Sequence, residues 1–355
     1  MKSPLMLLAG KTAFERIQAH GFQATLFDTV VGASGGAKML ALTHLDRYVF
    51  GEFFASSSHR VELFGSSIGT WRHVAAASPE PVSALTALQD RYLNQSWDEN
   101  DKRTAMEIAD ELCEWVVDGF CTADVAKYIC KTSRFRTHIV TARGRGLNAR
   151  PAGPLLGAGM VASAALNVLH RRLLGSSFQR IVFSSGDSVA FQFKDFNTSH
   201  VGLTPSILKA ALLASGSIPF LMSGQRDIPG APHGHLWDGG IVDYHFDFNN
   251  FCGDGLVLYP HFSTRTVKGW FDKPLPWRCN RARALDKVLL LAPSPQYLAQ
   301  LPYGKIPDRK DFTRLDHADR RKYWNIAMSR SRALRDAFAE AVTAAEPAQF
   351  LMPIR

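Results

Sequence analysis

Ser34 stands in the run Gly-Ala-Ser-Gly-Gly, residues 32–36, directly after a short apolar segment. This is the Gly-x-Ser-x-Gly pattern of a nucleophile elbow, a sharp strand-to-helix turn that presents a serine hydroxyl at the edge of a sheet. Gly32 and Gly36 suit such a turn, because it strains the backbone and brings its flanking residues close together. The helix after the turn directs its first amides at the position where an oxyanion would form. The pattern therefore predicts that Ser34 is a nucleophile.

Two later segments add to this pattern. An Asp-Gly-Gly run occupies residues 238–240, and residues 214–220 read Ala-Ser-Gly-Ser-Ile-Pro-Phe. Taken alone, Asp-Gly is a common turn dipeptide, and small-residue turns like that at Ser34 also occur for packing reasons. In this order and spacing, the three motifs resemble those of the patatin-like phospholipase family. The resemblance covers roughly residues 5–244 of the chain.

The family resemblance implies a catalytic dyad of Ser34 and Asp238, in which the aspartate takes the serine proton as general base without an intervening histidine. Gly239 and Gly240 would let the aspartate sit on a tight turn that faces the serine. The implied reaction is hydrolysis of a lipid or lipid-like acyl ester, of the phospholipase A type, and it requires neither a metal nor an organic cofactor. The same dyad also supports acyl transfer to an acceptor other than water.

The family also carries a glycine-rich oxyanion loop after its first strand, usually followed by a basic residue. The corresponding stretch here, residues 9–12, reads Ala-Gly-Lys-Thr and keeps one glycine. The resemblance implies that the backbone amides of Gly10 and Lys11 hold the oxyanion, aided by the amide of Gly35. Because the loop has fewer glycines than the family pattern, a second hypothesis is a lipid- or protein-binding relative with little turnover.

Two other chemical interpretations stay open from the residues. An α/β-hydrolase would pair the serine with a histidine, for which His245 and His261 are candidates, but several strands precede the elbow in that fold and about thirty residues do not supply them. Asp238, Asp243, His245 and Asp247 form a sequence cluster that a metal could use. Acids and aromatic residues at a strand-to-loop transition are a sufficient explanation of that cluster, so we expect no metal site.

The elements that must position these side chains alternate short apolar runs with longer helical patterns. This alternation predicts an α/β fold with a mostly parallel central sheet and helices on both faces, and the resemblance implies the three-layer form of the patatin family. We expect one domain, residues 1–355, with a core at about 5–292 and a helical addition at about 293–345. The expected strands are 5–8, 29–31, 138–142, 181–183, 256–259 and 288–291. The expected helices are 12–20, 36–50, most of 79–128, 155–169, 205–215 and 316–345.

The composition is that of an ordinary globular protein, since 46% of the 355 residues are hydrophobic and 21% are charged. The net charge of +9 suits an anionic partner such as a membrane surface, although a solvated helical face explains it as well, and no nucleic-acid partner is expected. Five cysteines without a Cys-x-x-Cys pair favour a reducing compartment. We therefore expect a cytoplasmic protein with a lipid or acyl-ester substrate, and peripheral contact with an anionic membrane is one option.

The most apolar stretch of the chain is 155–169. It is shorter than the ~18 uninterrupted apolar residues that a membrane span needs. One interpretation is a packed helix of the core, and the other is an interfacial element or a lid beside a lipid site.

Overall fold

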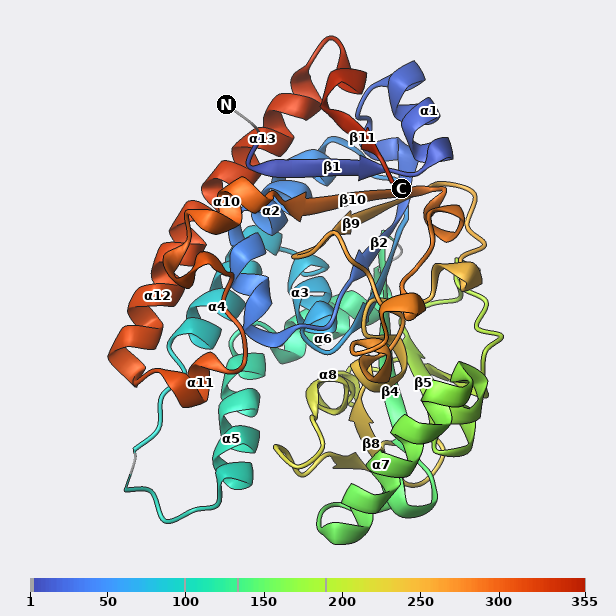
Figure 1. The fold of residues 1–355 in the computed structure, drawn as a ribbon, viewed down its shortest axis with the longest axis vertical. Coiled ribbons are helices and arrows are strands. Elements are labelled where there is room, and N and C mark those ends of the chain that lie inside the picture. The colour runs from blue at the N-terminus through green and yellow to red at the C-terminus, as the bar shows by residue number, and fades with distance from the viewer. Residues whose placement is uncertain (1–2, 99, 133, 189, 355) are drawn as a thin grey trace.

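A mixed β-sheet forms the centre of the molecule (Figure 1). The computed structural model describes residues 3–98, 100–132, 134–188 and 190–354. The strands follow the order β11-β1-β10-β9-β2-β3-β4-β5-β6, and beside this path β8 pairs with β4 and β7. The strands are β1 (Leu5–Ala9), β2 (Phe27–Gly32), β3 (Val61–Ser66), β4 (Phe135–Gly144), β5 (Phe178–Ser184), β6 (Thr198–Gly202), β7 (Gln225–Arg226), β8 (His235–Asp238), β9 (Leu256–Pro260), β10 (Val288–Pro293) and β11 (Leu351–Pro353).

Local signals account for the starts of several helices. Helix α5 begins with a capping box in which Thr104 and Glu107 bond reciprocally. Helices α4 and α7 begin at Pro81 and Pro154, where the missing N–H of proline costs nothing. The helices are α1 (Lys11–His20), α2 (Thr43–Tyr48), α3 (Ile68–Ala76), α4 (Pro81–Leu93), α5 (Ala105–Asp118), α6 (Ala123–Lys131), α7 (Pro154–Leu169), α8 (Leu208–Gly216), α9 (Gly240–Asp243), α10 (Pro295–Ala299), α11 (Asp311–Arg314), α12 (His317–Arg330) and α13 (Arg332–Thr343).

The middle of the sheet is parallel, so the expectation of an α/β fold with a mostly parallel central sheet is confirmed. Strands β10, β9, β2, β3 and β4 run in one direction, whereas β1 is antiparallel to β10, and β5 and β8 are antiparallel to β4. Parallel neighbours end at the same edge of a sheet, and Gly32 at the end of β2 lies opposite Gly65 in β3. The loops after β2 and β3 therefore leave the sheet side by side, which is where open α/β sheets bind ligands.

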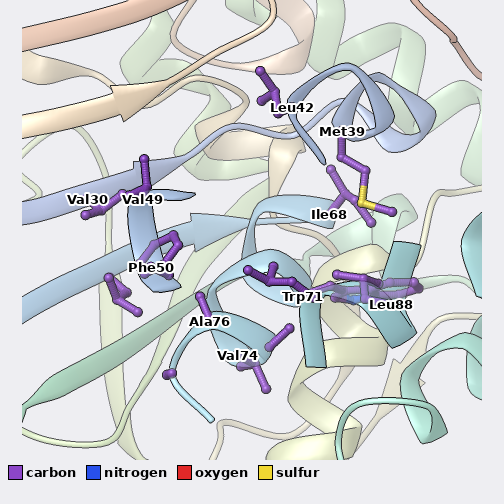
Figure 2. Close-up of a cluster of buried hydrophobic side chains, with 14 of the residues drawn as sticks. Val30, Met39, Leu42, Val49, Phe50, Ile68, Trp71, Val74, Ala76 and Leu88 are labelled. Carbon is purple, nitrogen blue, oxygen red and sulfur yellow. The ribbon is translucent and has the colours of Figure 1, made fainter. Parts of the chain in front are cut away.

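Both faces of the central strands are buried, so successive side chains enter two clusters. Val30 of β2 belongs to the larger cluster, to which α2, α3, α4, α8, α12 and α13 also contribute. Val31 belongs to a smaller cluster that includes Leu156 of α7. Figure 2 shows part of the larger cluster, to which β2, α3 and α4 contribute Val30, Trp71 and Leu88. Packed side chains thus hold the sheet on both faces, so the loops at its edge leave from rigid strands.

Several expected elements differ from the observed ones. The helix expected at 36–50 consists of a 3-10 helix (Gly36–Leu42), α2 and a π-helix (Val49–Phe53). The helix expected at 316–345 divides at Ser331, whose hydroxyl donates to the carbonyl oxygen of Met328 at 2.7 Å and competes with the helical bonds. The C-terminal region also adds a strand to the sheet, since β11 pairs with β1. No helix in the described ranges is long and apolar enough to cross a membrane.

A close approach of two glycines joins β2 to α3, and it predicts a stability effect. A Cβ atom on Gly69 would lie 2.1 Å from the carbonyl oxygen of Gly32. We expect Gly69→Ala to lower the free energy of unfolding by about 1–3 kcal/mol, because the backbone must move apart. Gly157→Ala in α7 is the matched control, since a Cβ atom there meets open space. It should raise the free energy of unfolding by about 0.5–1 kcal/mol. Urea denaturation measures both, and equal effects would contradict the packing argument.

Candidate active site

Ser34 lies in the turn between β2 and the 3-10 helix that begins at Gly36. Its backbone N–H donates to the carbonyl oxygen of Tyr244 at 2.9 Å, which holds the turn against a segment far away in the sequence. Gly36 has φ +56°, a left-handed conformation that glycine adopts without strain. The strand-turn-helix geometry expected at Ser34 is present, with a 3-10 helix in place of the α-helix. Ser34 is only 2% exposed, so its hydroxyl is covered in this structure.

Asp238 ends β8 and faces Ser34 across Gly240. A Cβ atom on Gly239 would lie 2.0 Å from the carbonyl oxygen of Val140, so this turn requires glycine. A Cβ atom on Gly240 would lie 2.6 Å from Ser34 Oγ and 2.9 Å from Asp238 Oδ1. The two oxygens therefore border one small space that stays open because residue 240 has no side chain. The structure brings together the two residues of the predicted dyad and the glycines that flank them.

The hydroxyl of Ser34 is bonded to a second serine. Ser34 Oγ lies 2.8 Å from Ser66 Oγ, and Ser66 donates to the carbonyl oxygen of Asp243 at 2.5 Å. Because the single hydroxyl proton of Ser66 is used in this way, Ser34 is the donor in the bond with Ser66. Within the described chain no hydrogen bond joins Ser34 to Asp238. A rotation of the Ser34 side chain or a bridging water is needed to connect them.

The carboxylate of Asp238 has two donors of its own. Ser67 Oγ donates to Oδ2 at 2.7 Å, and the backbone N–H of Gly240 donates to Oδ1 at 2.6 Å. Ser67 has φ 54°, which is uncommon for serine, and its N–H donates to Ser215 Oγ at 2.9 Å. The 214–220 segment, whose Ala-Ser start is part of the predicted motif, thus positions the residue that orients Asp238.

Sequence reasoning missed Ser66 and Ser67. Ser66 ends β3 and Ser67 follows it, at the same edge of the sheet at which Ser34 follows β2, because β2 and β3 are parallel neighbours. The run from Gly65 to Gly69 reads Gly-Ser-Ser-Ile-Gly and is nearly as rich in small residues as 32–36. This similarity is the signal in the sequence for a second turn beside Ser34. It can be interpreted only once β2 and β3 are known to be paired.

Burial sets the acidity of the candidate base. It raises the pKa of Asp238 to about 6, while the hydrogen bonds from Ser67 and Gly240 oppose this rise. A carboxyl with this pKa can accept a proton and return it near neutral pH.

Cations lie close to this carboxyl. Burial, together with the charges of Lys38 and Arg309, lowers the pKa of Lys273 to about 8. Lys273 Nζ donates to the hydroxyl of Tyr244 at 3.2 Å, and Lys38 Nζ lies 4.7 Å from the centre of the Phe262 ring. Both ammonium groups therefore contact uncharged side chains, those of Tyr244 and Phe262. The charges of Arg309 and Lys273 act on Asp238 and suit a substrate with a negative group, while the Asp308 carboxylate acts on both lysines.

Gly10 and Lys11 do not reach Ser34, and their prediction as oxyanion donors is wrong. Strands β10 and β9 separate β1 from β2, and β1 runs antiparallel to them, so its carboxyl end lies at the opposite edge of the sheet. The N–H of Gly10 donates to the carbonyl oxygen of Val288 at 2.9 Å, and Lys11 begins α1. Of the three predicted donors, Gly35 is the one that adjoins Ser34.

The two candidate histidines have other partners. His245 Nδ1 accepts the N–H of Val267 at 3.1 Å, and His261 Nδ1 lies 2.6 Å from the carbonyl oxygen of Ser263. Burial lowers the pKa of both, that of His261 to about 3. Neither ring is hydrogen-bonded to Ser34 in the described chain, so the geometry favours the dyad over a triad.

Two of the three acidic residues considered for a metal site, Asp243 and Asp247, pair with separate cations, whereas Asp238 accepts the hydrogen bonds from Ser67 and Gly240. Asp243 pairs with Arg180 at 2.5 Å, and Asp247 pairs with Lys268 at 2.8 Å. No group of three or more potential metal ligands occurs among the residues that the structure describes. Ion pairing thus accounts for the cluster around residue 243.

Buried arginines hold the segment 238–244 in place. Arg180 bonds the carboxylate of Asp243, and Arg171 donates to the carbonyl oxygen of Val242 at 2.6 Å. The next two carbonyl groups of the segment accept Ser66 Oγ and the N–H of Ser34. The backbone of this one segment therefore sets the distance between the candidate nucleophile and the candidate base.

No protein-family model matches the chain, and no curated protein matches it. A functional conclusion therefore depends on the residues of this site and their geometry.

Asp238 makes stability depend on pH. Its pKa is raised from 3.8 to about 6 in the folded protein, so the folded state holds this proton more tightly than the unfolded state. Raising the pH from about 4 to about 7 should therefore destabilise the wild type relative to Asp238→Asn, by roughly 2–3 kcal/mol. Urea unfolding of both proteins at several pH values measures this change. Parallel curves for the two proteins would contradict the raised pKa.

Proposed function

We propose that the protein is a patatin-like serine acyl hydrolase, with the three-layer fold of that family, that cleaves lipid or lipid-like esters in the manner of a phospholipase A. One observation carries the proposal. Ser34 Oγ and Asp238 Oδ1 border the same space above Gly240, at 2.6 and 2.9 Å from the position that a Cβ atom would take there. This placement permits proton transfer directly or through one water. The raised pKa of Asp238 and the order of the sequence motifs support the same reaction.

In the proposed reaction, the Ser34 hydroxyl turns from Ser66 towards Asp238 and attacks the ester carbonyl carbon. Asp238 takes the hydroxyl proton, and the negative charge that forms on the carbonyl oxygen is stabilised by the N–H of Gly35. The tetrahedral intermediate expels the alcohol, which receives the proton from Asp238, and leaves the acyl group on Ser34. A water molecule then gives a proton to Asp238 and attacks the acyl carbon. The bond from that carbon to Ser34 Oγ breaks, Asp238 returns the proton to Oγ, and the carboxylic acid leaves.

The cations around the site favour an ester with a negative group. Lys38 and Lys273 contact uncharged side chains, so a phosphate or carboxylate next to the ester would be attracted to them. This supports a phospholipid-type substrate over a neutral ester. The reaction uses side chains and amides of this chain and needs no cofactor. We propose a cytoplasmic enzyme, as the cysteine content favours.

One observation favours a second candidate, a lipid- or protein-binding relative with little turnover. The Ser34 hydroxyl donates a hydrogen bond to Ser66 Oγ and Ser34 is 2% exposed, so in this structure it is neither bonded to its base nor open to solvent. A fluorophosphonate probe separates the two candidates, because it labels only an activated serine. Acyl transfer is a variant of the first candidate, and product analysis with and without an alcohol acceptor distinguishes it from hydrolysis.

Removing either half of the dyad should abolish hydrolysis. We expect the wild type to cleave short p-nitrophenyl esters and to be labelled by the probe at Ser34. Ser34→Ala and Asp238→Asn should each lose at least about 10³-fold in kcat/KM, because the two groups act as a unit. Ser206→Ala, at an exposed serine before α8, is the matched control and should keep the wild-type rate. Full activity of Ser34→Ala would rule out the proposal.

The pH dependence should report the Asp238 carboxyl. We expect kcat/KM to rise with pH through about 6, because Asp238 must lose its proton to act as a base. Ser67→Ala removes a donor that stabilises the carboxylate, so the rise should move to higher pH by about one unit. Ser66→Ala, which leaves the contacts of Asp238 unchanged, should keep the wild-type midpoint. A profile that Ser67→Ala does not shift would show that another group titrates.

A further inference from the structure

The outward side of α7 is apolar from one end to the other. Residues 154–169 contain no Asp, Glu, Lys or Arg. Val161 is 71% exposed and Leu169 is 75% exposed. The free side of a surface helix is ordinarily polar, and a contiguous exposed apolar side marks an interaction site. The exposed apolar residues, which we call the α7 apolar face, are Leu155, Ala158, Val161, Ala162, Ala165, Val168 and Leu169.

The opposite side of α7 is fixed to the rest of the molecule. Asn148 donates to Ser163 Oγ at 3.0 Å, and Asn167 donates to the carboxylate of Asp272 at 2.8 Å. At the end of the helix, Arg278 donates to the carbonyl oxygen of Asn167 at 2.9 Å. These bonds hold the helix in one rotation on the outside of the molecule (Figure 1). The α7 apolar face therefore stays at the surface.

A basic cleft adjoins the carboxyl end of α7. It has a volume of about 650 Å³ and lies between the helix end and the segment 277–284. Arg281 and Arg283 are exposed, and Trp277 is 64% exposed. Its lining combines apolar and basic side chains, among them Val168, Leu169, Trp277, Arg278, Arg281 and Arg283.

We propose that the α7 apolar face and this basic cleft dock the protein on an anionic lipid surface. A helix of 16 residues is about 24 Å long, so α7 lies on a bilayer and does not cross it. Its apolar side enters the headgroup boundary, Trp277 sits at the interface, and Arg281 and Arg283 meet lipid phosphates.

The charge of the basic cleft favours an anionic lipid surface over a second copy of the chain as the partner. In a symmetric dimer, a second copy of the chain would bring the same arginines to the same contact, and the chain carries a net charge of +9. An anionic bilayer supplies both an apolar layer for Val161 and Leu169 and phosphates for Arg281 and Arg283.

The docking surface is connected to the candidate active site, although the inference does not depend on the reaction proposed there. Arg171, two residues after α7, donates to the carbonyl oxygen of Val242 and pairs with Asp272 at 3.2 Å. Asp272 also accepts Asn167 of α7. A docked α7 is thus attached through buried bonds to the segment that carries Asp238.

Sedimentation with lipid vesicles tests the docking. We expect the full chain to bind phosphatidylcholine vesicles with about one third phosphatidylglycerol, and to bind pure phosphatidylcholine vesicles at least about ten-fold more weakly. Arg281→Ala with Arg283→Ala should weaken binding to the anionic vesicles about five-fold per arginine. Val161→Glu with Leu169→Glu should weaken it at least about ten-fold, because carboxylates then enter the apolar layer. Val82→Glu, at an exposed valine of α4, is the matched control and should bind like the wild type.

Further variants and measurements distinguish a failure of docking from a failure of hydrolysis and from misfolding. Ser34→Ala should bind vesicles like the wild type, so a failure of the proposed hydrolysis leaves the docking testable. Circular dichroism and thermal melting verify that each variant folds, and the arginine pair provides a second test if the α7 variant does not. Absence of binding to anionic vesicles, or binding that neither double variant weakens, overturns the proposal. A dimer that Val161→Glu with Leu169→Glu dissociates, without vesicle binding, assigns the face to self-association.

Discussion

The pairing of Arg180 with Asp243 is the interaction on which the site depends. Both residues are fully buried, and two hydrogen bonds of 2.5 and 3.0 Å join them. The Asp243 side chain secures the segment that also carries Asp238, while its carbonyl oxygen accepts the hydroxyl of Ser66. Removing one partner of such a pair strands a buried charge, at a cost of about 3–5 kcal/mol. The candidate nucleophile and base share this support, so a shift of the pair would displace both.

Close backbone contacts are the second constraint. Gly32 and Gly69 let β2 and α3 touch, and Gly240 keeps open the space between Ser34 and Asp238. At these three positions the glycine is needed because it has no side chain, whereas at Gly36 it is needed for a left-handed backbone. The proposed chemistry takes place in a volume that an alanine at position 240 would fill.

Sequence patterns predict the parts of the site that are encoded locally. Ser34 follows β2 and Asp238 ends β8, each is followed directly by two glycines, and such turns are recognisable without their partners. The prediction for Gly10 and Lys11 was wrong because the direction of β1 is set by its pairing with β10, near the other end of the chain. Ser66 was missed for a similar reason, since its place beside Ser34 follows from the register of two strands. The hydrophobic periodicity of one segment does not indicate which distant strand it pairs with, or in which direction.

The strand order has a consequence for the nascent chain. β2 lies between β3 and β9, and β1 pairs with β10 and β11, so the strands that leave the ribosome first meet several of their partners last. Until β10 emerges, β1 has free edges, which invite association with other chains. Closing loops over most of the sequence also slows formation of this part of the sheet. During translation, Ser34 is therefore synthesised well before β9 completes the sheet around it, and we expect the exposed strand edges of the partly synthesised chain to bind chaperones.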